Sequence, residues 1–433
     1  MKPTIRSLLL ACCALCPTLA HALSDIEANI LAHIDQEMPQ AMSLLEKTVN
    51  INSGTMNPVG VKQVGHIFMD ELSQLGFDCH WLSLPPELHR AGHVWAEKKG
   101  LQGKRLLLIG HLDTVFEADN PFQQFQLRGD QAHGPGVIDM KGGDVAIIFA
   151  LRALKASGAL EDAQITVALM GDEEHAGRPT SVSRAPLIET AKRSDIALEF
   201  EFGGETIAQV VTARRGVSRW QLEVTSKSSH SAKIFSSEAG VGAILGATEL
   251  LHAFYQDLLT EKYLTFNPGV ILGGTQITYE AQQSQGTVFG KENIMASDVL
   301  IEGDLRFISG AQERLAREHM KKIAASAPPL TQARITFIDG YPAMAPSAGN
   351  AALLAQLSHI SEELGVGPLS AFPLLDRGAS DVSFVANYVD ALAGLGAIGG
   401  GAHTQQEYMD VKQFPAVIKR AALLIYRLTR AGS

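Results

Sequence analysis

The first half of the chain alternates short apolar runs with segments of helical spacing. Residues 105–109, 165–170 and 195–200 are apolar runs of the length of a buried parallel strand. Residues 146–154 have the spacing of a helix. This alternation of strand and helix predicts an α/β fold with a doubly wound sheet.

The pattern changes after residue 215. Strand patterns and two helical patterns then follow in the order β-α-β-β-α-β, at residues 217–225, 238–255, 269–279, 298–307, 312–324 and 334–338. This is the order of a ferredoxin-like domain. The α/β pattern resumes after Pro342, with helices expected at 350–364 and 411–429.

We therefore predict two domains, which the length of 433 residues also favours. Residues 23–214 and 340–433 would form the larger α/β domain. Residues 215–339 would form a compact α+β domain inserted into it.

The N-terminus has the pattern of a signal peptide over residues 1–22. Lys2 and Arg6 precede an apolar stretch, and Ala20-His21-Ala22 offers a cleavage site. A buried N-terminal helix is the alternative interpretation. Cleavage would leave Cys79 as the only cysteine, so no internal disulfide could form. We expect a secreted or periplasmic protein that is not held in a membrane, because no other apolar run approaches a bilayer-spanning length.

The formal net charge of −10 argues against nucleic acid or anionic membrane as a partner, because both favour a basic surface. The charge does not identify a substrate.

Polar side chains with metal-binding chemistry follow several of the expected strands. His111 and Asp113 come directly after the first strand, and Asp113 could accept a hydrogen bond from the His111 ring. Asp139 precedes a helix in a glycine-rich segment, where a helix cap is the simpler interpretation. Asp172-Glu173-Glu174 follows the second strand, where three adjacent carboxylates repel one another unless a cation offsets them.

Two further segments add to this set. Glu199 and Glu201 share one face at the end of the third strand. His403 follows three glycines and the apolar run 391–398. Active groups of open α/β sheets gather at the carboxyl ends of strands. A two-metal site with a bridging carboxylate accounts for all of these residues, and mixed histidine and carboxylate ligands suit zinc.

These motifs, in this order and spacing, resemble the zinc-dependent aminoacylase/carboxypeptidase family of metallopeptidases, and most closely its glutamate carboxypeptidase-like branch. The resemblance runs from about Gly110 to Asp410. It implies a catalytic domain carrying an inserted ferredoxin-like lid and dimerisation domain, and thus a homodimer.

The resemblance also implies roles for individual residues. Two zinc ions per chain would be held by five ligands, with Asp139 bridging and manganese or cobalt as alternative metals: His111, Asp139, Glu174, Glu201 and His403. Glu199 remains an alternative to Glu201. Glu173 would be the general base, and Asp113 would orient His111.

In the inserted domain, His230 resembles the histidine that approaches the scissile carbonyl, in some relatives from the partner subunit. Asn293 and Arg306 fall where relatives bind the substrate. The chain has Gln209 and Tyr341 where glutamate-specific members carry Lys and Arg, which puts a preference for glutamate in doubt.

The expected activity is hydrolysis of an amide bond in a small peptide or N-acyl amino acid, most closely as a carboxypeptidase. An aminoacylase, dipeptidase or aminopeptidase of the same family is the alternative. A non-catalytic binding protein is a third interpretation, against which an intact Glu173 argues, because a binder needs no base.

Overall fold

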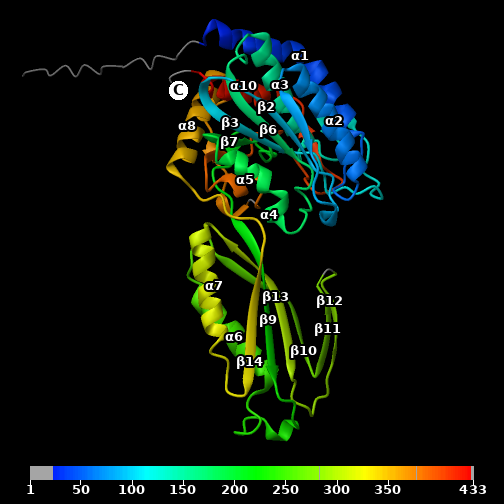
Figure 1. The fold of residues 1–433 in the computed structure, drawn as a ribbon, viewed down its shortest axis with the longest axis vertical. Coiled ribbons are helices and arrows are strands. Elements are labelled where there is room, and N and C mark those ends of the chain that lie inside the picture. The colour runs from blue at the N-terminus through cyan, green and yellow to red at the C-terminus, as the bar shows by residue number, and fades with distance from the viewer. Residues whose placement is uncertain (1–22, 282, 377, 431–433) are drawn as a thin grey trace, which may run out of the picture.

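The structure is a computed structural model that describes residues 23–430 except 282 and 377. It consists of a larger α/β body and an elongated second body that extends from it (Figure 1). The predicted signal peptide at 1–22 lies outside the described residues. Among the helices that are described, none is long and apolar enough to cross a membrane.

The central sheet of the larger body has six strands among the described residues, in the order β1-β2-β6-β3-β7-β16. Strands β6, β3, β7 and β16 are parallel, while β1 and β2 are antiparallel additions at one edge. The strand bounds are β1 Asp78–Leu82, β2 His93–Lys98, β3 Gln102–His111, β6 Ala163–Met170, β7 Ile196–Glu199 and β16 Asp390–Leu392.

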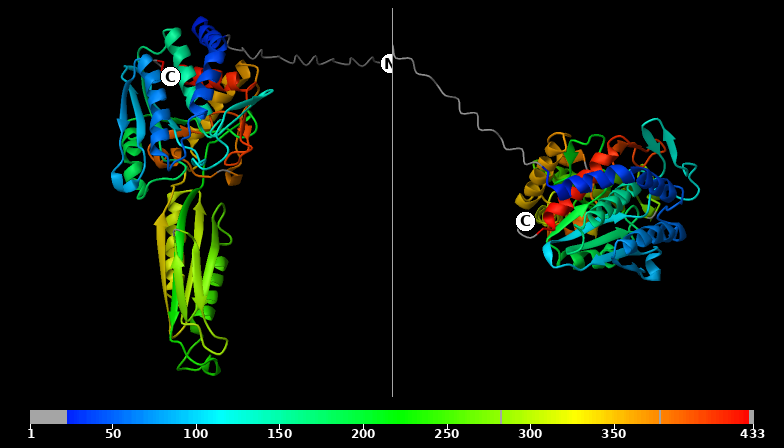
Figure 2. Two further views of the ribbon diagram at one scale, coloured as in Figure 1. Left: turned by 90° about the vertical axis from the view of Figure 1, so that its right-hand side faces the viewer. Right: turned by 90° about the horizontal axis from the view of Figure 1, so that it is seen from above.

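Helices cover both faces of this sheet, as the doubly wound prediction requires (Figure 2). Alternate side chains of β3 explain the two layers, because Leu106 and Leu108 belong to one hydrophobic core whereas Leu107 and Ile109 belong to another. The helices of the first core are α1 Asp25–Val49, α2 Pro58–Gln74, α3 Lys141–Ala156, α8 Ala348–Glu363 and α10 Phe414–Leu428. Those of the second are α5 Ala185–Ala191 and α9 Val382–Val385.

The second body has the predicted ferredoxin-like order. Its antiparallel sheet runs β10-β13-β9-β14. Apolar residues of α6 and α7 and alternate side chains of β9 and β13, including Trp220 and Ile301, form a separate core. The bounds are β9 Gly216–Ser226, α6 Gly242–Leu258, β10 Thr265–Gly274, β13 Asp298–Phe307, α7 Gly310–Ala324 and β14 Thr331–Asp339.

The prediction of a single strand at 269–279 is wrong. This segment contains the end of β10 and a separate strand, β11 (Gln276–Glu280), which forms a hairpin with β12 (Gln285–Phe289). The chain leaves the sheet after Gly274, because the Gly274 carbonyl accepts from Ser297 N–H while Thr275 N–H donates to the Phe289 carbonyl. A Cβ at Gly274 would lie 2.5 Å from that carbonyl oxygen, so only glycine fits there.

Short elements complete the larger body. A small sheet of order β17-β18-β5-β4 lies among the described residues, and β8 pairs with β15. The bounds are β4 Gln126–Arg128, β5 Gln131–His133, α4 Thr180–Ser183, β8 Gln209–Val210, β15 Ser370–Ala371, β17 Gly399–Gly400 and β18 Tyr408–Asp410, with 3-10 turns at Pro86–Leu88 and Leu374–Asp376. A further 3-10 turn, Ser231–Lys233, belongs to the second body.

The two bodies are joined by a pair of crossing segments. Arg214 and Met344 exchange backbone hydrogen bonds of 2.9 and 3.0 Å, and Val217 N–H donates to the Tyr341 carbonyl at 2.9 Å. The outgoing and returning chains are therefore bonded to each other as they pass between the bodies. Arg214 and Tyr341 carry their side chains into the site described next.

Candidate active site

The predicted ligands converge at the carboxyl ends of β3, β6 and β7. Ligand atoms of His111, Asp139 and Glu201 all lie within 4.8 Å of one another, and so do those of Asp139, Glu174 and His403. Asp139 belongs to both groups. The carboxyl edge of the sheet thus brings together residues that are up to 292 positions apart in the sequence.

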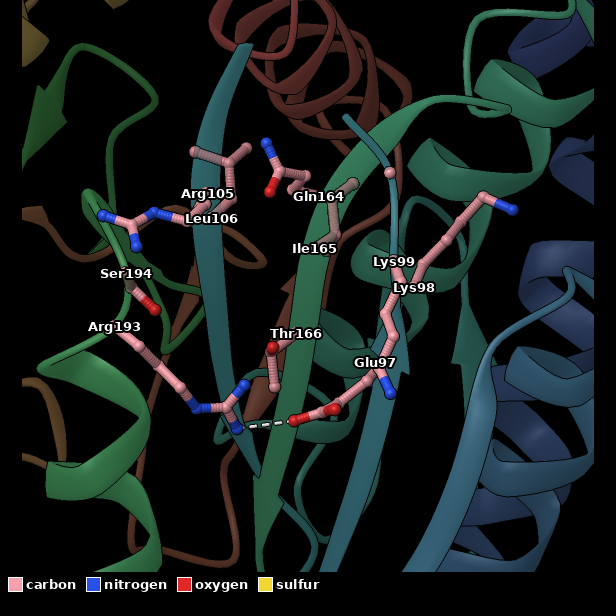
Figure 3. A pocket seen from close by; sticks show the side chains of 11 residues that line it. Glu97, Lys98, Lys99, Arg105, Leu106, Gln164, Ile165, Thr166, Arg193 and Ser194 are labelled. Atoms are coloured by element: carbon pink, nitrogen blue, oxygen red, sulfur yellow. Dashed lines mark hydrogen bonds and ion pairs between the residues drawn. The ribbon is translucent and has the colours of Figure 1, made fainter. Parts of the chain in front are cut away.

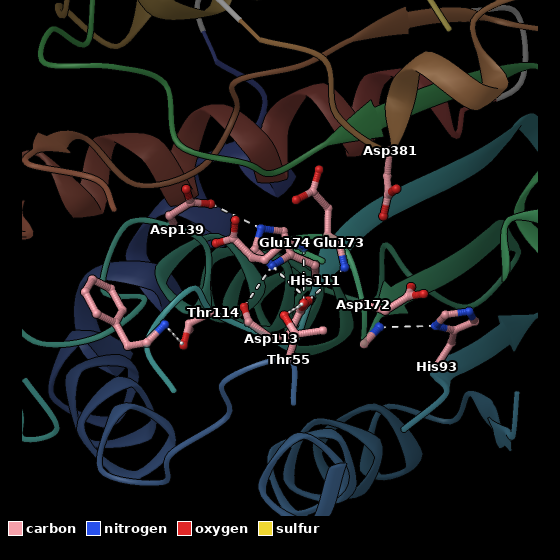
Figure 4. Close-up of polar contacts among 12 residues, drawn as sticks. Thr55, His93, His111, Asp113, Thr114, Asp139, Asp172, Glu173, Glu174 and Asp381 are labelled. Atoms are coloured by element: carbon pink, nitrogen blue, oxygen red, sulfur yellow. Dashed lines mark hydrogen bonds and ion pairs between the residues drawn. The ribbon is translucent and has the colours of Figure 1, made fainter. Parts of the chain in front are cut away.

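The two carboxylate oxygens of Asp139 contact two different imidazole rings. Its Oδ1 lies 3.1 Å from His111 Nε2, and its Oδ2 lies 3.0 Å from His403 Nε2 (Figure 4 shows the first of these pairs). Glu174 Oε2 is 3.3 Å from the same nitrogen of His403. The peptide bond between Asp139 and Met140 is cis, and Asp139 does not cap α3. A carboxylate placed in this way can bridge two cations.

The electrostatics of the site fit a pair of cations. Burial and the charge of Asp139 raise the pKa of Glu174 to about 7, and Glu174 Oε1 is buried without a hydrogen-bond partner. Hydrogen bonds to Asp139 and Glu174 raise the pKa of His403 to about 11. Divalent ions stabilise buried carboxylates that lie close together and have raised pKa values. A bound ion would also provide a partner for Glu174 Oε1.

Asp113 contacts His111 differently from the prediction. His111 Nδ1 lies 3.0 Å from the Asp113 backbone carbonyl, while the nearer carboxylate oxygen is 3.5 Å away. The carboxylate instead accepts backbone N–H bonds from Glu173 at 3.0 Å and Glu174 at 3.1 Å, and a 2.6 Å bond from the Thr55 hydroxyl. Asp113 therefore orients His111 and also holds the turn that carries Glu173 and Glu174.

Glu173 stands beside the two ligand groups on the turn after β6 (Figure 4). Burial raises its pKa well above the usual range, and the charges of Asp381, Glu201 and Glu174 add to this effect. The Tyr341 hydroxyl donates to the Glu173 carbonyl at 2.8 Å. Such a carboxyl group can take up and hold a proton near neutral pH.

The geometry favours Glu201 over Glu199 as a ligand. Glu199 accepts bonds of 2.7 and 2.8 Å from the Ser380 hydroxyl and one of 2.8 Å from Val382 N–H. Glu201 instead faces His111 and Asp139. Arg214 forms ion pairs with both glutamates, so it offsets their like charges.

The expected repulsion among three carboxylates after β6 involves only two of them. Asp172 is turned away into a buried ion pair with Arg184, which also bonds Asp381 at 2.6 Å. Arg184 Nη2 donates to the Tyr341 hydroxyl at 3.2 Å. A buried guanidinium, rather than a metal, compensates Asp172, and the same network supports the turn of Glu173.

We expect Arg184→Met to lower the free energy of unfolding by about 3–5 kcal/mol, because it leaves two buried carboxylates without a cation. Urea denaturation of the metal-free protein measures this effect. Arg193→Met is the control, since it removes a half-exposed ion pair with Glu97 and a hydrogen bond to Thr190, and should cost at most about 1 kcal/mol. Equal stability of the two variants would show that Arg184 is not the compensating charge.

The three residues predicted in the inserted domain, His230, Asn293 and Arg306, lie at opposite ends of the second body. His230 and Asn293 lie together at the far end of the second body, where Ser231 N–H donates to the Asn293 carbonyl. They stand beyond the end of β9, whose length places them roughly 30 Å from the hinge (Figure 1). Arg306 lies at the hinge end, paired in register with Val217.

Some residues that shape the site had no role assigned from the sequence, where Tyr341 was noted only as a departure from glutamate-specific relatives. Thr55, Arg184 and Tyr341 act through side-chain contacts made across the fold. Each lies in a segment that also suits a turn or an exposed surface. Only their burial and their partners in space distinguish them.

A cavity of about 280 Å³ lies at the opposite, amino-terminal edge of the parallel strands (Figure 3). The ion pair between Arg193 and Glu97 crosses it, and Arg105 lies at its rim. None of the predicted site residues lines this cavity. This cavity is therefore separate from the candidate active site.

Comparisons with known proteins show what the chain is similar to. The chain is 28% identical over 433 residues to carboxypeptidase G2 from Pseudomonas sp. (strain RS-16), covering 99% of each chain. It is 22% identical over 405 residues to a succinyl-diaminopimelate desuccinylase from Thioalkalivibrio sulfidiphilus, covering 90% of this chain and 99% of the relative.

Among solved structures, aminopeptidase PepT from Bacillus cereus shares the fold, with a TM-score of 0.72 at 16% identity over 91% of this chain and 99% of that one. A dinuclear metal-binding peptidase from Bacillus subtilis has a TM-score of 0.63 at 13% identity, over 91% and 99%. A family model described as "Peptidase family M20/M25/M40" matches residues 107–427. The chain therefore belongs to the M20/M25/M40 family of metallopeptidases.

Proposed function

We propose that this peptidase is a two-zinc carboxypeptidase of the glutamate carboxypeptidase type. It would release the C-terminal residue of a small peptide, or the amino acid of an N-acyl amino acid, by hydrolysing the amide bond. The observation that carries the proposal is the sharing of Asp139 between two groups of histidine and carboxylate ligands, with Glu173 beside them.

The residues present fit two zinc ions. His111, Asp139 and Glu201 would hold one ion, and Asp139, Glu174 and His403 would hold the other. Manganese and cobalt suit similar ligands and are the alternatives. Bound ions of this kind polarise an amide carbonyl and lower the pKa of water.

Glu173 would carry the proton during the reaction. It takes the proton of the attacking water and delivers it to the leaving amine nitrogen. Burial supports this role, because it raises the pKa of Glu173 and so lets the carboxyl group keep the proton between the two transfers. Asp113 and Tyr341 hold the backbone of Glu173 in place.

Two arginines at the hinge, Arg215 and Arg306, support the proposal that the substrate carries a free C-terminal carboxylate. Arg215 donates to the Thr265 hydroxyl at 3.2 Å, and Thr265 pairs in register with Arg306. Burial and the nearby charge of Arg306 lower the pKa of Arg215. Arg306 Nε donates to Asp304 at 2.9 Å, and the remaining N–H donors of the two neighbouring guanidinium groups match the geometry of a substrate carboxylate.

Arg306→Leu should raise KM for substrates with a free α-carboxylate by about 10–100-fold, because a charge-assisted hydrogen bond contributes about 1.5–3 kcal/mol. We expect a smaller change in kcat. Arg219→Leu on the same sheet is the matched control, since Arg219 forms an ion pair with Glu302 just as Arg306 does with Asp304. If Arg306→Leu raises KM for a substrate with a C-terminal amide as much as KM for the same substrate with a free carboxylate, Arg306 does not bind the carboxylate.

A hydrolysis screen of the purified, metal-loaded protein tests the activity itself. N-acyl amino acids, N-blocked dipeptides, free dipeptides and N-succinylated amines would be compared at equal concentration. Cleavage of N-blocked substrates that end in a free carboxylate supports the carboxypeptidase. A requirement for a free N-terminus would indicate an aminopeptidase or dipeptidase instead.

We also propose that the chain works as a homodimer joined through its second body. Within one chain His230 lies far from the ligands, so the partner subunit's His230 would have to supply the group that stabilises the carbonyl oxygen. Mixing inactive His230→Ala and Glu173→Gln subunits should restore activity, because a mixed dimer contains one complete site. A monomeric, active protein would contradict this arrangement.

We place the mature protein outside the cytoplasm, in the periplasm or secreted, on the pattern of residues 1–22. Expression of the full chain followed by cell fractionation tests this. Deletion of residues 2–22 should retain the protein in the cytoplasm.

A further inference from the structure

A buried glutamate outside the ligand set binds the backbone around Asp139. Glu407 has no exposed surface. Its carboxylate accepts N–H bonds from Gly136 at 3.2 Å, Ile138 at 2.9 Å and Asp139 at 3.2 Å. A carboxylate that accepts three backbone amides holds a loop by charge-assisted hydrogen bonds, which are stronger than neutral ones.

The backbone of Glu407 belongs to the turn that carries His403. Glu407 N–H donates to the Thr404 carbonyl at 3.1 Å, and Thr404 N–H donates to the Gly401 carbonyl at 3.0 Å. His403 itself has a left-handed backbone with φ 62°, which the turn has to maintain. Directly after Glu407, β18 pairs with β5, with Tyr408 opposite His133. Glu407 is thus bonded to both segments that meet at the second ligand group.

A buried lysine next to this loop is hydrogen-bonded to the segment that follows α1 and to its last turn. Lys141 is fully buried at the start of α3, and its Nζ donates to the carbonyls of Thr48 and Ile51, each at 3.1 Å. The loop that Glu407 binds is compact, because a Cβ on Gly136 would lie only 3.3 Å from Lys141 Cδ.

We propose that Glu407 is a positioning residue that sets the separation of Asp139 and His403 and so determines the affinity for the metal ion shared by Asp139, Glu174 and His403. This inference rests on the proposed two-metal function. A neutral amide at position 407 would offer one acceptor oxygen and would turn an NH₂ group toward backbone donors. The loop of Asp139 would then relax away from His403, while the contacts of His111 and Glu201 would change less.

The test is a metal titration of the apo protein, wild type and Glu407→Gln, with zinc against a competing chelator. We expect the variant to bind one ion with an affinity close to that of the wild type and the second about 10–100-fold more weakly, the range typical of residues that orient metal ligands. The metal-induced rise in Tm should shrink, and excess zinc should restore kcat.

Glu27→Gln is the matched control. Glu27 is also a buried carboxylate that accepts a backbone N–H, from Ser24 at 2.8 Å, but it lies on α1 and pairs with Arg427. This variant should leave both zinc affinities and kcat unchanged.

Two results would overturn the inference. One is a Glu407→Gln variant with both affinities within twofold of wild type, whatever its Tm. If that variant does not fold, Glu407→Asp takes its place, since it keeps the charge but is too short to reach all three amides; unchanged affinities in Glu407→Asp are the second such result. A wild-type protein that binds fewer than two ions would instead contradict the proposed function, so the two failures are distinguishable.

Discussion

Glu173→Gln should lower kcat by about 10²–10⁴-fold while two metal ions per chain stay bound, because the substitution removes the proton acceptor and leaves every proposed ligand in place. Glutamine keeps the size of the side chain, and the backbone bonds from Asp113 and Tyr341 to residue 173 do not involve its carboxyl group. Steady-state kinetics combined with elemental analysis of the same samples measures both effects.

Glu174→Gln provides the contrast, because the neighbouring residue is a proposed ligand with an oxygen that lacks any other partner. It should lose metal together with activity. Glu189→Gln, an exposed residue on α5, should behave as wild type. Turnover within tenfold of wild type in Glu173→Gln would remove Glu173 from the role of base.

His111→Ala should reduce the bound metal to at most one ion per chain and lower activity by at least about 100-fold, since even residues that only orient ligands contribute that much. Because the variant lacks one ligand of the group that contains Asp139 and Glu201, it should bind metal more weakly. We therefore expect metal to raise its Tm less than it raises that of the wild type. Elemental analysis and thermal unfolding with and without zinc give both quantities.

His319→Ala is the control for His111→Ala, because His319 is a half-exposed histidine on α7 that contacts Asp257 in the second body. It should keep full metal content and activity. A His111→Ala protein that still holds two ions with wild-type affinity would mean that the ligands lie elsewhere.

Local periodicity was sufficient to predict the core strands β3, β6, β7, β9, β13 and β14, because a strand or helix that buries one face repeats apolar residues at its own spacing. The helices α1 and α2 and the edge strands β1 and β2 were not predicted. Strand β13 has the predicted bounds, and Val299, Ile301, Leu305 and Phe307 share its buried face. The hairpin β11–β12 was not predicted. A glycine pair marks the place where the strand ends, but only contacts with the distant Ser297 and Phe289 turn the chain there.

The sequence by itself determined which side chains could meet, since polar residues that follow buried parallel strands must reach the same edge of the sheet. It left Glu199 and Glu201 as alternatives, because period-two alternation places both on one face. Only the tertiary structure separates them, through the Ser380 and Val382 bonds that occupy Glu199. The same holds for Asp172 and Glu407: a carboxylate in a polar turn has the same pattern whether it faces solvent, an arginine or three backbone amides, and its partners are decided by contacts between segments distant in the chain.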